Sequence, residues 1–359
     1  MSAVHEPKPV AADPTTLPYE HFTSPSWLQR EQEAIFERSW LYVTHTSELE
    51  RPGDYVTARV GKVPLVLTRD EDGVLHALRN VCCHRGAEAV PAGCGNAKVL
   101  QCQYHGWTYK LDGRLAGAPR SRSEPGFDKG DFALAPARID TYGPFVFVNL
   151  DRDAPPLLEA LEEIPALVAD TGVEVDELRF GERREYIVEA NWKVVVENYL
   201  ECYHCPVAHP SFADVIDLNS YTIETFGRTS TQIGQPKDAD AAADAAIKVR
   251  YGRYNYIWPT FMLNIYPGPG NVSTNLIVPL GVDRTLAVYD FFYEEGADQG
   301  AAEEITGLIH QVMVEDVGLC ESVQRGMASE TFAAGRLMLR YEHSIKHFQS
   351  LVREALAAG

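Results

Sequence analysis

Two short cysteine–histidine pairs constrain this chain more than any other feature of its sequence. One residue separates Cys82 from His84, two residues separate Cys102 from His105, and seventeen residues lie between the pairs. Each pair offers one thiolate and one imidazole, which are good ligands for iron and zinc. The fold therefore has to bring two loops to one metal centre.

The make-up of the pairs favours an iron–sulfur cluster over zinc. A [2Fe–2S] cluster of the Rieske type has two cysteines on one iron and two histidines on the other, which fits one mixed pair on each loop. Zinc sites usually group two cysteines together and two histidines together. Cys83 and Cys94 do not fall at the motif spacing. We interpret Cys83 as a spacer and Cys94 as a loop residue.

Length, composition and charge limit the other possibilities. The chain has 359 residues, enough for two domains. No uninterrupted apolar run could span a bilayer, and no signal peptide is visible at the N-terminus. Seven scattered cysteines argue against a disulfide framework and for a cytoplasmic protein. The net charge of −19 disfavours nucleic acid and membranes as partners and suits a basic redox partner or a cationic substrate.

The pattern of apolar runs and turns predicts an α+β protein with two domains. We expect residues 1–17 to be a mobile tail, and residues 18–40 to hold a helix, over 26–40, that packs on the second domain. Residues 41–150 should form an antiparallel β domain that carries the cysteine–histidine pairs. Residues 151–359 should contain strands followed by a long helix over about 301–328 and a terminal helix over about 340–357.

A second group of potential metal ligands lies in the second domain. Glu197, Glu201 and His204 are spaced four and three residues apart, so on one helix they would share a face. Pro206 should break this helix, and the chain can then turn His209 back toward His204. Two imidazoles and one carboxylate form the ligand set of non-haem Fe(II) oxygenases, which leaves positions open for O₂.

The carboxylate of that set is predicted to come from the long helix. Its apolar stripe is formed by Ile305, Leu308, Val312, Leu319 and Val323. Asp316 falls on this stripe, where a carboxylate is costly unless it is paired or bound to a metal. We therefore expect Asp316 to be the third iron ligand. The alternative is a buried aspartate that is satisfied by helix caps or by a lysine or arginine.

With these motifs in place, the sequence resembles the α subunits of Rieske non-haem iron oxygenases over nearly its whole length. Besides the pairs, the resemblance rests on the Trp40 helix, Asn191-Trp192-Lys193, Glu197-Asn198-Tyr199, Tyr203-His204, His209-Pro210 and Glu315-Asp316. It implies a Rieske domain joined to a helix-grip catalytic domain, in which an antiparallel sheet wraps a long helix. It also implies a [2Fe–2S] cluster and Fe(II) bound by His204, His209 and Asp316.

The resemblance further implies a homotrimer in which the cluster of one subunit reduces the iron of its neighbour. In this family an acidic residue, usually aspartate, precedes the first iron histidine by three positions and links it to the second Rieske histidine across the interface. Glu201 and His105 match these positions, with glutamate in place of aspartate. Asn198 and Tyr203 flank the ligands and are expected to support them.

The C-terminal half is similar to the oxygenases of quaternary ammonium compounds, such as choline monooxygenase and the glycine betaine, stachydrine and carnitine oxygenases. The similar segments are 256–264, 274–281 and 315–326. This implies a terminal oxygenase that takes electrons from NAD(P)H through a flavin and iron–sulfur reductase, or a ferredoxin, and oxidises carbon next to nitrogen. The alternative is a ring hydroxylase or dioxygenase of an aromatic acid. The second iron motif argues against a simple electron carrier.

A cationic substrate needs aromatic rings around its ammonium group. Tyr254, Tyr256 and Trp258 alternate along one predicted strand, so their side chains would face a common volume. Further candidates for this aromatic box are Tyr251, Phe261 and Tyr266. The alternative for each of these residues is an ordinary core position in a strand.

Overall fold

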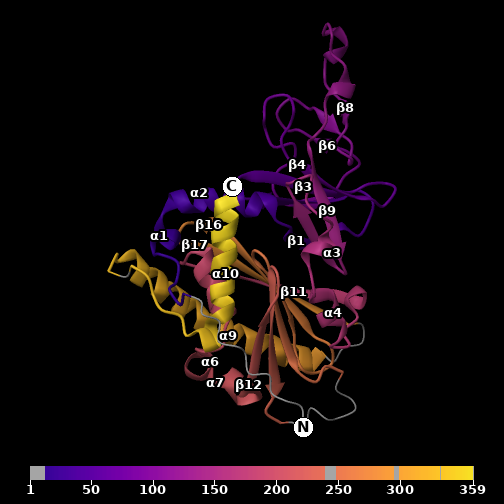
Figure 1. Ribbon diagram of the computed structural model, residues 1–359. Coiled ribbons are helices and arrows are strands. Elements are labelled where there is room, and N and C mark those ends of the chain that lie inside the picture. The colour runs from indigo at the N-terminus through magenta and orange to yellow at the C-terminus, as the bar shows by residue number, and fades with distance from the viewer. Residues whose placement is uncertain (1–12, 239–247, 295–298, 332, 359) are drawn as a thin grey trace.

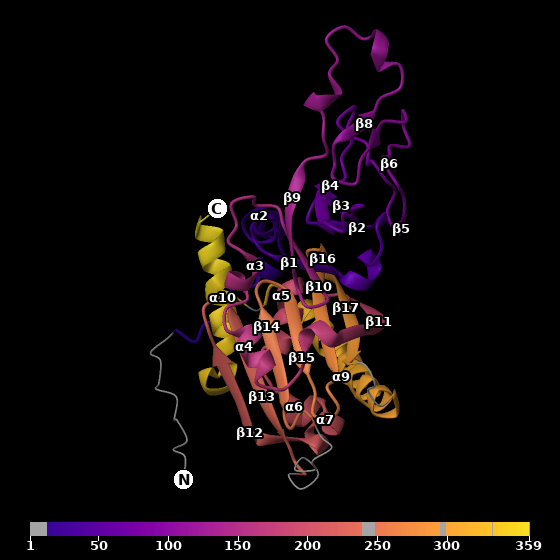
Figure 2. The same cartoon turned by 90° about the vertical axis from the view of Figure 1, so that its right-hand side faces the viewer.

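The computed structural model describes residues 13–238, 248–294, 299–331 and 333–358. A β-rich first domain lies at the top of Figures 1 and 2, above a second domain built on one large sheet. Strands β6 and β8 lie near the top in both views, whereas helices α6 and α7 lie near the bottom. None of the described helices is both long and apolar enough to cross a lipid bilayer.

Two antiparallel sheets build the first domain. The larger has the strand order β1-β10-β9-β4-β3-β2-β5, and the smaller has the order β6-β7-β8. The strands are β1 (Leu41–His45), β2 (Asp54–Val60), β3 (Val63–Arg69), β4 (Leu75–Arg79), β5 (Cys94–Asn96), β6 (Leu100–Gln101), β7 (Thr108–Tyr109), β8 (Leu115–Gly117), β9 (Pro136–Tyr142) and β10 (Phe145–Asn149). The turn between β3 and β4 is closed by Asp70, whose Oδ1 accepts the N–H groups of Asp72 and Val74. This is the behaviour expected of aspartate before a glycine turn.

The second domain contains one antiparallel sheet in the order β11-β17-β16-β15-β14-β13-β12. Its strands are β11 (Leu178–Val188), β12 (Ile216–Thr225), β13 (Thr229–Pro236), β14 (Gly252–Ile257), β15 (Phe261–Ile265), β16 (Val272–Gly281) and β17 (Arg284–Glu294). The α-helices among the described residues are α1 (Glu20–Thr23), α2 (Pro25–Ala34), α3 (Leu157–Ala160), α4 (Ile164–Ala169), α5 (Trp192–Tyr199), α6 (Cys205–Ala208), α7 (Pro210–Val215), α9 (Gln299–Ala328) and α10 (Leu339–Ala358). The long α9 and the antiparallel sheet confirm the predicted fold class.

The two faces of this sheet belong to different hydrophobic cores. Tyr256 and Met262 belong to the core that also contains residues of α5, α9 and α10. Ile257 and Phe261 belong to the core that contains residues of α3, α4, β1 and β10. Successive side chains of a strand point to opposite faces, so alternate residues of each strand belong to different cores.

A buried ion pair fixes the N-terminal helix α2 to α5. Lys193 Nζ lies 2.6 Å from Glu31 Oε1, and both side chains are fully buried. The other carboxylate oxygen, Glu31 Oε2, accepts the indole N–H of Trp192 at 2.8 Å. Both oxygens of Glu31 therefore have partners on α5, which is the condition for a charge to be tolerated in a core.

Two predictions for the N-terminal region are wrong. The predicted helix over 26–40 ends earlier, because α2 stops at Ala34 and a 3₁₀ turn over Phe36–Arg38 follows. Of the predicted mobile tail, residues 1–12 lie outside the described residues, but residues 13–17 are bound. Leu17 is fully buried, and its N–H donates to Gln349 Oε1 at 3.0 Å. Lys346 of α10 also donates to the Thr15 carbonyl, and the N–H of Leu337 donates to the Pro14 carbonyl, so hydrogen bonds hold this segment in place.

Candidate functional site

Two loops of the first domain carry the predicted cluster ligands, and each loop closes with the same kind of backbone turn. The first loop follows β4 and the second connects β6 to β7. The N–H of Gly86 donates to the Cys82 carbonyl, and the N–H of Gly106 donates to the Cys102 carbonyl, both at 3.0 Å. Both glycines have a positive φ, 76° and 70°, which costs glycine little. The glycine that follows each pair is thus needed to close the loop.

The four side chains of these loops come together with the thiols inside and the imidazoles outside. Cys82 and Cys102 are buried and free of disulfides. His84 and His105 are exposed, and their ring centroids lie 4.6 Å apart. Tyr109 Oη lies 3.1 Å from Cys82 Sγ. This arrangement can hold a two-iron cluster with one iron in the core and one at the surface, which suits exchange of electrons with a partner.

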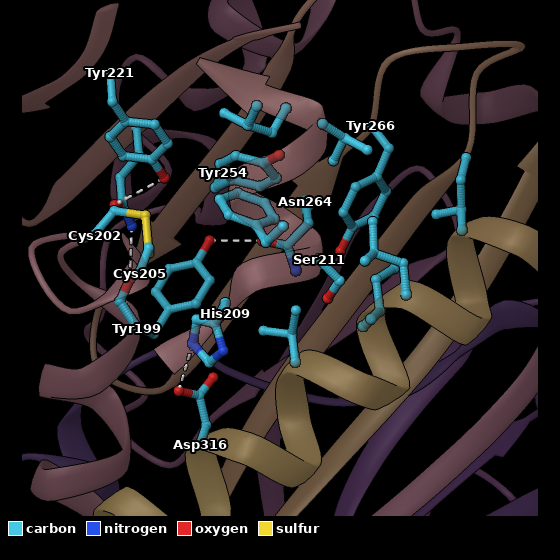
Figure 3. A pocket seen from close by; sticks show the side chains of 18 of the residues that line it. Tyr199, Cys202, Cys205, His209, Ser211, Tyr221, Tyr254, Asn264, Tyr266 and Asp316 are labelled. Atoms are coloured by element: carbon cyan, nitrogen blue, oxygen red, sulfur yellow. Dashed lines mark hydrogen bonds and ion pairs between the residues drawn. A yellow bond between two sulfur atoms is a disulfide. The ribbon is translucent and has the colours of Figure 1, made fainter. Parts of the chain in front are cut away.

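Three predicted iron ligands of the second domain, His204, His209 and Asp316, meet at one point. Figure 3 shows two of them, His209 and Asp316, side by side. His204 Nε2 and His209 Nε2 are 3.2 Å apart, and Asp316 Oδ1 lies 3.6 Å from the first and 3.0 Å from the second. Atoms bound to one metal at about 2.1 Å and at right angles would be about 3.0 Å apart. The three atoms can therefore hold a single metal ion on one side and leave its other side open.

A carboxylate holds the second ring nitrogen of each histidine. Glu201 Oε1 lies 2.5 Å from His204 Nδ1, and Glu315 Oε2 lies 2.8 Å from His209 Nδ1. Such a contact fixes the ring and its tautomer, so that Nε2 is free to bind a metal. Sequence reasoning missed this contact of Glu315, although the residue directly precedes Asp316.

The backbone that carries His204 differs from the prediction. Helix α5 ends at Tyr199, so Glu201 and His204 lie in the following loop and share no helical face with Glu197. Glu197 instead accepts a hydrogen bond from Gln349 Nε2 at 2.9 Å. Pro206 lies in the first turn of α6 and starts this helix, because proline lacks only an N–H that the first turn does not use.

The neighbours of the ligands have different roles. Asn198 Nδ2 donates to Asp316 Oδ1 at 3.0 Å and so orients this carboxylate. Tyr203 is half exposed, and its ring stacks on Tyr341 with centroids 5.1 Å apart. A disulfide joins Cys202 to Cys205 and closes the loop around His204. It is a single local bridge and not a disulfide framework.

A cavity of about 660 Å³ extends from the three ligand atoms (Figure 3). One wall is aliphatic and comes from α9, and the opposite wall is aromatic. The aliphatic residues are Ile305, Leu308, Ile309 and Val312, and the aromatic residues are Tyr199, Phe212, Tyr221, Tyr254, Tyr266 and Tyr289. Leu319 and Val323, which the sequence placed on the same stripe as Asp316, are exposed at the far end of the helix.

Of the predicted aromatic box, Tyr254 and Tyr266 line the cavity, and the other members lie elsewhere. Tyr256 packs on α10 in the core and donates to the Pro259 carbonyl. Trp258 donates its indole N–H to Ser39 Oγ at 3.1 Å. Phe261 follows the turn between β14 and β15 and points to the opposite face of the sheet.

Tyr251 is also outside the cavity, since its hydroxyl donates to Asp170 Oδ2 at 2.8 Å. Sequence reasoning missed Tyr199, Phe212, Tyr221 and Tyr289. Only two of them carry a local signal: Tyr199 follows the Asn198 motif, and Phe212 lies three residues after His209.

The cavity tyrosines are neutral. Burial raises the pKa values of Tyr199, Tyr221, Tyr254 and Tyr266 above the ordinary value for tyrosine. Three of the hydroxyls have protein partners: Tyr199 donates to Asn264 Oδ1, Tyr221 to Gln232 Oε1, and Tyr266 is hydrogen-bonded to Ser273. The wall therefore offers electron-rich ring faces to a ligand.

Comparison with known proteins identifies both domains. Residues 39–140 match the family described as Rieske [2Fe-2S] domain, and residues 175–358 match the ring hydroxylating alpha subunit (catalytic domain). The carnitine monooxygenase oxygenase subunit of Acinetobacter pittii (strain PHEA-2) is 36% identical over 99% of each chain. The chloroplastic choline monooxygenase of Beta vulgaris is 31% identical over 99% of this chain and 80% of the relative.

Solved structures agree with this assignment. A quaternary ammonium Rieske monooxygenase in complex with L-carnitine superposes with a TM-score of 0.83 at 35% identity, over 95% of each chain. Naphthalene 1,2-dioxygenase from Rhodococcus sp. gives a TM-score of 0.79 at 20% identity over 95% of this chain and 94% of the dioxygenase, and so shares the fold alone. This chain belongs to the Rieske non-haem iron oxygenases, as a terminal oxygenase subunit with a Rieske [2Fe–2S] cluster and a mononuclear iron.

Proposed function

We propose that this subunit is a monooxygenase of a quaternary ammonium compound. The observation that carries the proposal is the wall of neutral aromatic rings beside the three ligand atoms, of which Tyr254 and Tyr266 are part. Ring faces bind ammonium groups, more strongly when water is excluded. The similarity to carnitine and choline monooxygenases supports the same substrate class. The similarity to an aromatic dioxygenase is limited to the fold, so it does not favour an aromatic substrate.

We also propose which residues bind the two metal centres, and the positions of the cluster loops and of the three ligand atoms support this assignment. We assign the cluster to Cys82 and Cys102 on one iron and to His84 and His105 on the other, and the mononuclear iron to His204, His209 and Asp316. When bound, the cluster supplies electrons one at a time, and the mononuclear iron activates O₂.

The side chains around the iron site bind the substrate and orient the metal ligands. The tyrosine wall holds the ammonium group, and the aliphatic wall of α9 excludes water from the C–H bond that reacts. Glu201 and Glu315 keep the two histidine rings in place. Overall, one atom of O₂ enters the C–H bond and the other leaves as water, with two electrons from NAD(P)H and two protons consumed. Where the oxidised carbon bears nitrogen, the product then separates into an amine and an aldehyde.

The electron path supports an assembly of several subunits. Strand β6, which leads into the second cluster loop, lies near the top of the molecule, and helix α6, which follows His204, lies near the bottom (Figures 1 and 2). A cluster can be brought close to an iron if it belongs to another subunit of a homotrimer, with the neighbouring subunit's His105 against Glu201. Exposed apolar side chains beside both sites, Tyr104 on the cluster loop and Val207 on α6, suit such a contact.

The test is coupled turnover with a surrogate reductase. The purified oxygenase is mixed with NADH, O₂ and single compounds from a panel of choline, glycine betaine, L-carnitine and aromatic acids, and products are identified by mass spectrometry. We expect equal consumption of NADH and O₂ with formation of an oxidised amine or an aldehyde. Turnover of aromatic acids alone, with a phenol or a cis-diol as the product, would refute the proposal.

A pair of variants tests the aromatic wall. Tyr254→Leu should raise KM for the cationic substrate by about five- to thirtyfold, because a desolvated cation–ring contact contributes about 1–2 kcal/mol. Tyr254→Phe keeps the ring face and should stay within about twofold of the parent. Equal effects of the two variants would show that the ring itself does not bind the cation.

A further inference from the structure

The disulfide between Cys202 and Cys205 lies at the iron site and has no part in the chemistry proposed above. It encloses Tyr203 and His204, and both cysteines line the substrate cavity. Figure 3 shows the bond between the two sulfur atoms near Tyr199. A bond that small thiols can break and oxidants can form therefore lies directly beside a predicted metal ligand.

The other cysteines of the chain form no comparable pair. All of them lie in the described ranges, and none is in a disulfide. They are the two predicted cluster ligands Cys82 and Cys102, the exposed Cys83 and Cys94 of the first domain, and Cys320, which is buried on α9. The pair in the second domain is thus the one disulfide among the described residues.

The segment 201–208 buries little side-chain surface, and Cys205 is its only buried side chain. The exposed fraction of Cys205 is 5%, whereas those of Tyr203 and Val207 are 51% and 88%. A segment with little buried surface opens locally at a low cost in free energy. The disulfide ties the partly exposed Cys202 to the buried Cys205 and so limits this opening.

Both histidine ligands depend on this segment. His204 lies between the two cysteines, and the backbone N–H of His209 donates to the Cys205 carbonyl at 2.9 Å. Glu201, directly before Cys202, holds His204 Nδ1 at 2.5 Å. A closed disulfide therefore restricts the backbone that sets the spacing of the two imidazoles, and an open one releases it.

The pair can be oxidised and reduced through the cavity, whichever outer face a neighbouring subunit covers. Two thiols and one molecule of H₂O₂ give a disulfide and two molecules of water: the S–S bond forms, the O–O bond breaks, and each sulfur loses one electron. H₂O₂ is the product when O₂ takes up two electrons and two protons without oxidising a substrate. In the reverse direction, two thiol groups of a small reductant are oxidised to a disulfide while the pair regains two thiols.

We propose that Cys202 and Cys205 form a reversible oxidation site, with H₂O₂ as the oxidant and a small thiol as the reductant, and that their disulfide slows the loss of iron from the mononuclear site. This inference rests on the assignment of His204 and His209 as iron ligands in the proposed function, and it adds a control of metal retention. It does not depend on which substrate is oxidised.

The first experiment follows the redox state of the pair in the folded, iron-loaded protein. The protein is reduced with dithiothreitol and desalted, and one half then receives a few equivalents of H₂O₂. Both halves are alkylated with iodoacetamide in denaturant and digested with trypsin. Peptide 194–228 contains only Cys202 and Cys205, and peptide 86–98 contains only Cys94. Mass spectrometry should find two labels on peptide 194–228 after reduction and none after peroxide, whereas Cys94 keeps its label in both samples.

The second experiment measures the release of iron to a ferrous chelator under nitrogen, while the visible spectrum monitors the cluster. The reduced protein should release the mononuclear iron about three to ten times faster than the oxidised protein, because closing a short loop restricts its local opening. Cys202→Ser keeps the buried Cys205 in place and should release iron at the rate of the reduced parent, with or without dithiothreitol. Cys94→Ser should retain the difference between the two forms.

Three results would overturn the proposal. Full labelling of peptide 194–228 after peroxide would show that the pair does not close, and no labelling after dithiothreitol would show that it does not open in the folded protein. Equal rates of iron release from the two forms would show that the disulfide does not retain the metal. None of these results concerns the substrate, so the proposed function would stand and is tested separately by turnover of quaternary amines.

Discussion

Removing the ammonium group of Lys193 should destabilise the protein strongly. Lys193→Met keeps most of the volume of the side chain but leaves the carboxylate of Glu31 fully buried, with the indole N–H of Trp192 as its remaining partner. Leaving one member of a buried ion pair uncompensated costs about 3–5 kcal/mol. A domain has a total stability of about 5–15 kcal/mol, so this loss is a large fraction of it.

The assay is thermal unfolding of the intact protein followed by circular dichroism. A loss of 1 kcal/mol lowers Tm by about 2–4 °C in a domain of this size, so Lys193→Met should lower Tm by roughly 6–20 °C. The double variant Lys193→Met/Glu31→Leu removes both charges and should recover most of the loss, because apolar residues of similar volume can replace a buried pair.

The double variant decides whether the reasoning is right. If the two substitutions were additive, the ion pair would not be the origin of the loss. A Tm of Lys193→Met within 1 °C of the parent would refute the argument altogether. Iron content and the visible spectrum of the cluster serve as the control, since neither Lys193 nor Glu31 contacts a predicted ligand of the cluster.

Three further predictions concern the metal sites and the pH dependence of stability. His204→Ala should lower the iron content from about three to about two atoms per chain while the visible spectrum of the cluster remains, and an unchanged iron content would contradict its assignment as a ligand. Cys102→Ser should lose the visible spectrum with the cluster, and a retained Rieske spectrum would exclude Cys102 as a ligand. Burial raises the pKa of Glu197 to about 7, so the folded protein should lose stability as the pH rises from about 4.5 through 7. Glu197→Gln should remove this loss, so that above pH 8 the free energy of unfolding of the variant exceeds that of the parent by about 2–3 kcal/mol. Urea unfolding at several pH values measures this difference. A free energy of unfolding that changes with pH in the same way in both proteins would contradict the prediction.

The convergence of the metal ligands could be predicted because each ligand has a local signature. The cysteine–histidine pairs are short, and each is followed by the glycine that closes its loop. Asp316 stood out as a carboxylate among apolar residues, and it does meet His204 and His209. The prediction that Asp316 lies on a continuous buried apolar stripe was only partly correct, since Val312 lines the cavity but Leu319 is exposed.

The shape of the cavity could not be predicted, because it depends on the register between distant strands. Tyr254 and Tyr256 share a face of β14, but only the end of the strand near Tyr254 lies over the cavity. Phe261 lies directly after the turn to β15. The geometry of this turn decides which face of the sheet its side chain points to, and it points to the opposite core. Tyr221 comes from β12, whose position at the edge of the sheet leaves no trace in the local sequence.

Helix α9 carries both Asp316 and the aliphatic wall of the cavity. The number of residues before Asp316 should therefore be constrained more strongly than the number of residues after it. Each residue of an α-helix adds a rotation of about 100° and a rise of about 1.5 Å. A one-residue insertion between Ile305 and Asp316 would turn the wall away from the cavity while the ligand stays in place. The same insertion after Met327, at the end of the helix, would change neither. We therefore expect related enzymes to vary in length after this helix and to change substrate through the side chains of positions 305–312.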